Sequence, residues 1–113
     1  MRIRLAPQRR DDSLEVVRAG DTLLINGETF DFSQMRDSDT LPQGAIQSRW
    51  FVSDIDKADG ELTLTLLFPN PWNYSPEQAF PADLVDVPDG PVVFPQPLPT
   101  PAPDTDPIGE NAQ

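Results

Sequence analysis

The sequence predicts a small all-β fold, an antiparallel β-meander forming a sandwich or an open barrel, followed by an extended proline-rich C-terminal arm. Three observations support this prediction. In residues 1–68, short stretches of alternating apolar and polar residues are separated by glycine-containing turns. Twelve of the fourteen prolines lie between Pro69 and Pro107. Residues 1–68 carry twelve acidic and eight basic residues, whereas residues 69–113 carry seven acidic residues and no basic residue.

The first expected strand covers residues 1–5, where apolar and basic residues alternate, and we expect Pro7 to end it. Asn26-Gly27 lies between two apolar runs and predicts a hairpin, because a type I′ turn needs positive φ at both central positions. The remaining expected elements are strands over residues 14–18, 22–25, 28–32, 45–55 and 61–68, a loop over residues 33–44, and a turn at Asp59-Gly60.

Three parts are expected along the chain. Residues 1–68 form the small β domain, residues 69–94 an extended segment framed by aromatic residues and prolines, and residues 95–113 a polyproline-like acidic tail. A β domain of about 65 residues buries only roughly 60% of its unfolded surface. The chain has no cysteine for a disulfide, so we expect the domain to depend on partner proteins for part of its stability.

The composition argues against an enzyme. Without histidine or cysteine, the chain lacks the usual general base, the thiolate nucleophile and the commonest metal ligands. The acidic residues Asp54, Asp56, Asp59 and Glu61 do not match the calcium-loop spacing, and we interpret them as a solvated turn. We therefore expect no catalytic residue, no metal and no cofactor.

The charge distribution limits the classes of partner. A net charge of −11 argues against nucleic-acid binding, and the chain has no apolar run of the roughly 18 residues that a membrane span requires. We therefore expect no nucleic-acid partner and no membrane insertion. The main basic cluster is expected to pair with acidic residues of the C-terminal part or of a neighbouring subunit; it consists of Arg2, Arg4, Arg9 and Arg10.

The candidate partner-binding residues are aromatic residues and prolines beyond residue 68. Trp72 and Tyr74 occupy a proline-framed loop, where they either contact a partner or cap the open face of a sheet. A sugar ring is an alternative ligand for these two side chains. The full candidate set is Trp72, Tyr74, Phe80, Phe94, Pro95, Pro97, Pro99 and Pro101.

Four stretches, at residues 1–10, 24–32, 59–67 and 89–92, resemble short proteins encoded in the tail modules of tailed bacteriophages and prophages of Gram-negative bacteria. The resemblance covers roughly residues 1–95 and contains no catalytic motif. It implies a structural protein of the tail tip or baseplate that attaches tail fibres or receptor-binding components. The implied partners are fibre, hub or receptor-binding proteins in a symmetric assembly with several copies of the chain. The implied location is the virion tail, after synthesis in the host cytoplasm.

Two other functions stay open from the sequence. A tail-fibre assembly chaperone would share the same partners but be missing from the finished virion. An acidic inhibitor that mimics DNA would use the negative charge, although eight basic residues dilute that charge. Mass spectrometry of purified particles separates the structural protein from the chaperone.

Overall fold

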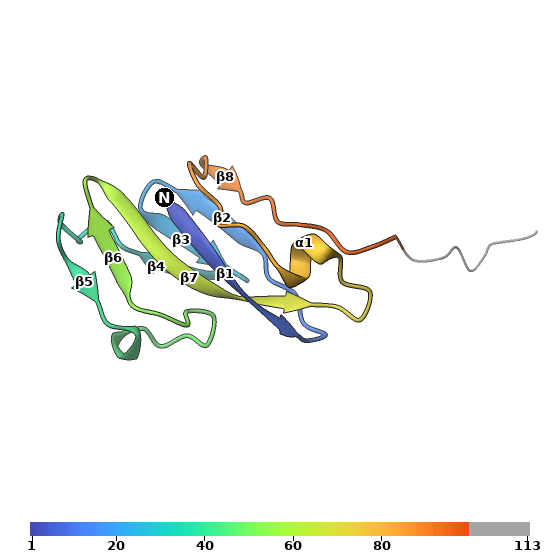
Figure 1. Ribbon diagram of the computed structural model, residues 1–113. Coiled ribbons are helices and arrows are strands. Elements are labelled where there is room, and N and C mark those ends of the chain that lie inside the picture. Colours follow the sequence, from blue (N-terminus) through green and yellow to red (C-terminus); the bar gives the residue numbers. More distant parts are fainter. Residues whose placement is uncertain (100–113) are drawn as a thin grey trace, which may run out of the picture.

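The computed structural model describes residues 1–99. Two four-stranded sheets pack face to face over one shared core, which confirms the predicted all-β fold (Figure 1). The first sheet has the order β1 (Arg2–Arg9), β7 (Glu61–Asn70), β6 (Ile55–Ala58), β5 (Thr40–Leu41). The second has the order β4 (Glu28–Asp31), β3 (Thr22–Ile25), β2 (Val16–Ala19), β8 (Gly90–Pro91). A 3₁₀ turn, η1 (Gln43–Ala45), and one helical turn, α1 (Pro76–Ala79), complete the described elements.

Both predicted glycine turns are present. Asn26 and Gly27 join β3 to β4 with φ values of 48° and 85°, and Asp59 and Gly60 join β6 to β7 with φ values of 52° and 78°. Positive φ at both central residues is the conformation that a type I′ turn requires, and its twist matches that of the flanking strands. The two-residue loops therefore set the register of both hairpins.

We expect Gly27→Val to lower the free energy of unfolding by about 1–3 kcal/mol, because a β-branched residue is strained at positive φ. A Cβ atom built at Gly27 meets no other atom within 4 Å, so the penalty comes from the backbone alone. Gly44→Val is the matched control, since Gly44 lacks positive φ and its Cβ position is equally open. Urea unfolding of both variants measures the effect, and equal losses would show that backbone strain at Gly27 is not the cause.

The core is built by the alternating faces of the strands. From Leu62 to Phe68, β7 buries Leu62, Leu64, Leu66 and Phe68, in the two-residue period that the sequence predicts. The other sheet contributes Val16, Leu23 and Ile25 to the same cluster. Thus each sheet presents one apolar face to the other.

The β1 pairing differs from the expected antiparallel meander. β1 lies parallel to β7, with Arg2 opposite Thr63 and Arg9 opposite Asn70. A parallel neighbour needs a long connection, and here the strands β2 to β6 lie between the two partners in sequence. The expected end of this strand at Pro7 is also wrong, because β1 continues to Arg9. Proline is tolerated there because β1 is an edge strand of its sheet.

The strand expected over residues 45–55 is wrong. Most of that stretch is a loop, which touches the sheet through one isolated bridge between Phe51 and Leu66, and regular pairing begins only at Ile55. The cause lies in two consecutive apolar residues, since Trp50 and Phe51 are both buried, at 7% and 1% exposure. A strand with one covered face buries every second side chain, so the loop conformation is what lets this stretch bury two adjacent side chains.

Residues 84–91, the closing segment, connect the edges of the two sheets. Leu84 exchanges two backbone hydrogen bonds of 2.8 Å with Ile3 on β1, and β8 pairs with β2 in the other sheet. Between these contacts, Val87 enters the core at 5% exposure. The boundary expected after residue 68 falls inside β7, and the closing segment carries part of the fold.

Candidate partner-binding surface

Exposed apolar side chains gather on residues 72–98. Six of the nine large apolar residues that are exposed among the described residues lie there: Trp72, Tyr74, Phe80, Val85, Val93 and Leu98. The exposure is highest at Phe80, with 87%, and reaches 67% at Trp72. Val85, Val93 and Leu98 were not in the predicted set, because single apolar residues among prolines and acids show no periodicity that assigns them to a face.

The loop that carries the two exposed aromatic residues is tied to the start of the proline-rich run. Asn73 donates from Nδ2 to the carbonyl oxygen of Leu98 at 2.7 Å, and the Leu98 amide donates to the Asn73 carbonyl oxygen at 2.9 Å. These two bonds fix residues 97–99 next to the neighbours of Asn73, which are Trp72 and Tyr74. Asn73 was not in the predicted set, because its contact with Leu98, twenty-five residues later, depends on the fold.

The predicted set divides into outward and inward residues. Trp72, Tyr74 and Phe80 are exposed, and so are Pro97 and Pro99. Phe94 is half-buried, with its ring centroid 5.6 Å from that of Phe68 and an interplanar angle of 31°. Pro95 is also half-buried, and Pro101 lies outside the described residues. The inward pair anchors the segment on the end of β7, while the outward residues are available to a partner.

The helical turn α1 holds the aromatic loop in place. Ser75 caps it with a capping box, in which the Gln78 amide donates to the Ser75 hydroxyl and the Ser75 amide donates to Oε1 of Gln78. Asn70, at the end of β7, donates from Nδ2 to the Gln78 carbonyl oxygen at 2.7 Å. All three side chains are buried. The Ser-Pro-x-Gln pattern is the sequence signal that would have identified this turn.

A hollow of about 320 Å³ lies beside the anchored proline segment. Residues 11–14 form one wall, residues 94–97 form the other, and the end of β7 contributes Phe68 and Pro69. Its lining combines carboxylates at Asp11 and Asp12 with apolar rings and prolines.

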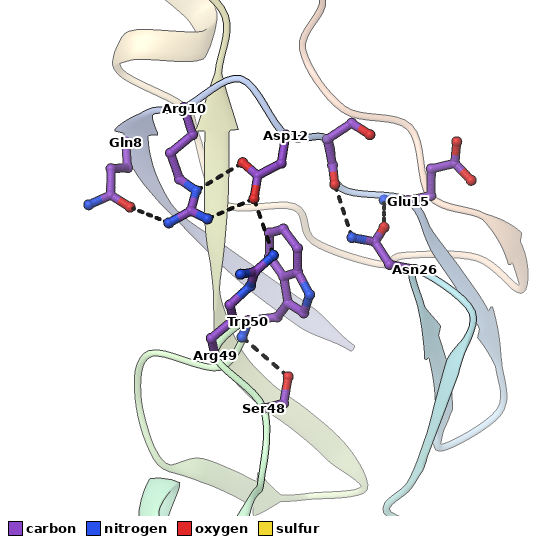
Figure 2. Close-up of polar contacts among 9 residues, drawn as sticks. Gln8, Arg10, Asp12, Glu15, Asn26, Ser48, Arg49 and Trp50 are labelled. Carbon is purple, nitrogen blue, oxygen red and sulfur yellow. Dashed lines mark hydrogen bonds and ion pairs between the residues drawn. The ribbon is translucent and has the colours of Figure 1, made fainter.

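A polar network fixes the acidic wall of this hollow (Figure 2). Arg10 donates from Nε and Nη2 to the two carboxylate oxygens of Asp12 at 2.8 and 2.7 Å, and Arg49 approaches the same carboxylate at 3.4 Å. The Arg49 guanidinium lies 5.1 Å from the ring centroid of Trp50. The hydrogen bonds from Arg10 lower the pKa of the Asp12 carboxyl below its usual value. Asp12 thereby stays ionised and links residues 10–12 to the loop before Phe51.

Asn26 supports the same wall from the second sheet. Its side chain accepts a hydrogen bond from the Glu15 amide at 2.7 Å and donates to the Ser13 carbonyl oxygen at 2.9 Å (Figure 2). Asn26 is also the first central residue of the β3–β4 turn. One residue thus fixes both the hairpin and the wall of the hollow.

The arginines of the basic cluster pair within the chain. Arg2 and Arg4 both approach the carboxylate of Asp83, at 2.9 and 3.8 Å, so part of the cluster pairs with the C-terminal part. Arg9 pairs with Asp11 at 2.8 Å, and Arg10 pairs with Asp12 as described above. These ion pairs are largely exposed, and such pairs contribute about 0–1 kcal/mol each. The two pairs with Asp83 orient the C-terminal segment more than they stabilise it.

The described residues contain no group of three or more acidic side chains arranged to hold a metal ion. None of their helices is long and apolar enough to cross a membrane. Comparison with protein-family models, curated proteins and solved structures finds no match for this chain.

Proposed function

We propose that the chain is a non-enzymatic structural protein of a bacteriophage tail tip or baseplate. It attaches fibre or receptor-binding components through the surface formed by residues 72–98. The observation that carries the proposal is the gathering of exposed apolar side chains on this one segment. The phage setting comes from the sequence resemblance to tail-module proteins.

The geometry supports attachment in two ways. Trp and Tyr are the residues most enriched at the energetic centres of interfaces, and here Trp72 and Tyr74 project from a loop that α1 and Asn73 hold in place. Prolines restrict the free chain, so a partner that binds residues 95–99 has less conformational entropy to overcome. Exposed aromatic side chains on a loop held in this way favour a specific protein partner.

Particles purified after induction of a lysogen that carries the coding sequence provide the test. We expect mass spectrometry to find the wild-type chain in particles at a fixed ratio to the other tail proteins. Trp72→Ala should reduce its amount in particles by at least about tenfold, because truncating a central aromatic contact typically costs about 2 kcal/mol or more of binding free energy. Leu24→Ala, an exposed apolar residue on β3, should leave incorporation unchanged.

Two outcomes would contradict the proposal. Equal incorporation of the Trp72 and Leu24 variants would mean that the surface of residues 72–98 does not attach the protein. A wild-type chain that is abundant in the lysate and undetectable in particles would favour the assembly chaperone instead.

A further inference from the structure

The two open sides of the sandwich differ. On one side the closing segment bonds to the β1 edge at Ile3 through Leu84 and to the β2 edge through β8, so the chain itself contacts both edges. On the other side lie β4 and β5, the outer strands of their sheets (Figure 1). The described residues place no further strand against either of them. A row of unpaired backbone groups therefore remains at this side.

The β3–β4 hairpin shows which groups of β4 are free. In a two-residue hairpin the pair that flanks the turn exchanges both backbone hydrogen bonds, and bonded pairs then alternate with non-bonded pairs. Glu28 therefore bonds to Ile25, and Phe30 bonds to Leu23. The amides and carbonyls of Thr29 and Asp31 point away from β3, toward the free edge of the sheet. Both outward residues are exposed, and no other described segment forms a backbone hydrogen bond with them.

A groove with a mixed apolar and polar lining runs along this free edge. Two hollows of about 290 and 270 Å³ follow residues 28–32 of the chain and share Asp31, Phe32 and Leu41 in their linings. Phe30 and Ile46 line one of them, and Met35 lines the other. An added strand places every second side chain on one face, so its apolar side chains would fall into this groove.

The rim of the groove is negative. Glu28, Asp31 and Asp39 line the two hollows, and no lysine or arginine lines either of them. Hydrogen bonds from Ser33 and from the Thr22 hydroxyl lower the pKa of the Asp31 carboxyl, which keeps it ionised. The charge selects a cationic partner and opposes a second copy of the chain, since pairing two β4 edges would bring like charges together.

We propose that the free edge of β4 and its groove form a strand-addition site. Its occupant is an extended segment of a partner protein in which apolar residues alternate with lysine or arginine. The Thr29 and Asp31 backbone groups pair with the added strand, the apolar side chains enter the groove, and the basic side chains face the carboxylates of the rim. No residue of this site belongs to the surface of residues 72–98, so the chain can bridge two partners.

A ten-residue peptide of alternating lysine and valine is the probe for this site. We expect it to slow hydrogen exchange at the Thr29 and Asp31 amides by at least about tenfold at saturation, because these amides gain partners. A peptide of the same sequence in which every backbone amide is N-methylated lacks the backbone donors and should not bind. A glutamate–valine peptide should not bind either, because the rim repels it.

Substitutions at Thr29 distinguish backbone pairing from simple charge attraction. Thr29→Pro removes the outward amide, which makes no bond to β3, and should raise the Kd of the lysine–valine peptide by about tenfold or more. Thr29→Ser keeps the amide and should bind within about twofold of wild type. A second variant, Glu28→Gln with Asp39→Asn, leaves the backbone unchanged and should weaken both the binding and its dependence on salt.

Several results would overturn the proposal. The first is that the lysine–valine peptide shows no measurable binding. The second is that the Thr29→Pro and Thr29→Ser variants bind it equally, and the third is that it protects amides away from β4 from exchange. If Thr29→Pro does not fold, an unchanged Kd of the peptide for the variant with Glu28→Gln and Asp39→Asn would also overturn the proposal. The same amides could also become protected without peptide, to a degree that grows with protein concentration. That result would assign the edge to a second copy of the chain and overturn the assignment to a cationic partner.

Discussion

Val87→Asp is expected to lower the free energy of unfolding by about 3–5 kcal/mol. Burial of a valine side chain contributes about 1.5–3 kcal/mol, and an unpaired polar group in its place adds a further desolvation cost. Val87 is 5% exposed and lies in the core cluster with residues of both sheets. Since small domains have only about 5–15 kcal/mol of stability in total, this one substitution removes a large part of it.

Val85→Asp is the matched control for this prediction. It introduces the same charge two positions earlier, at a valine that is 51% exposed, and should change the stability by less than about 0.5 kcal/mol. Urea unfolding followed by circular dichroism measures both variants. Equal stability of the two would mean that the closing segment is not packed in the core, and that the fold ends near β7.

Local sequence signals predicted the hairpins correctly. The Asn26-Gly27 and Asp59-Gly60 turns depend on residues that accept positive φ, and this preference acts within four residues of chain. The alternation in β7 was equally readable, because Leu62, Leu64 and Leu66 face one side of the strand and the two threonines face the other. Neither signal requires knowledge of a distant partner.

Long-range pairing was not readable from the sequence. The parallel contact between β1 and β7 joins residues about sixty positions apart, and nothing in the pattern of β1 specifies the direction of its neighbour. The closing segment was missed for the same reason, since Leu84 and Val87 lie among prolines and acids without a strand period. Their burial is decided by the edges of sheets that the rest of the chain builds.

The two surfaces differ in how far the sequence revealed them. The aromatic residues Trp72, Tyr74 and Phe80 were identifiable because large apolar side chains in a proline-rich stretch have few core positions to occupy. The groove beside β4 was not identifiable, because its lining comes from three separate stretches that the fold brings together. Residues of an unusual type stand out in a sequence, whereas a groove depends on tertiary arrangement.

Phe51→Ala is expected to lower the free energy of unfolding by about 3–5 kcal/mol, the usual range for removing a buried phenylalanine. Phe51 is 1% exposed and makes edge-to-face contacts with Phe30 and Phe32, at centroid distances of 5.0 and 5.8 Å. Its backbone also bridges to Leu66 in the other sheet. The ring therefore holds the two sheets together on the side of the sandwich where β4 and β5 lie.

Phe51→Leu separates the loss of volume from the loss of the ring. Leucine fills most of the site, so this variant should lose about 1–2 kcal/mol, which covers the aromatic contacts and a small cavity. Because Phe30 and Phe32 line the groove beside β4, the alanine variant should also weaken binding of the lysine–valine peptide, and the leucine variant should largely retain it. An alanine variant as stable as the leucine variant would show that the ring contacts, and not the filled volume, account for the stabilisation at this side of the sandwich.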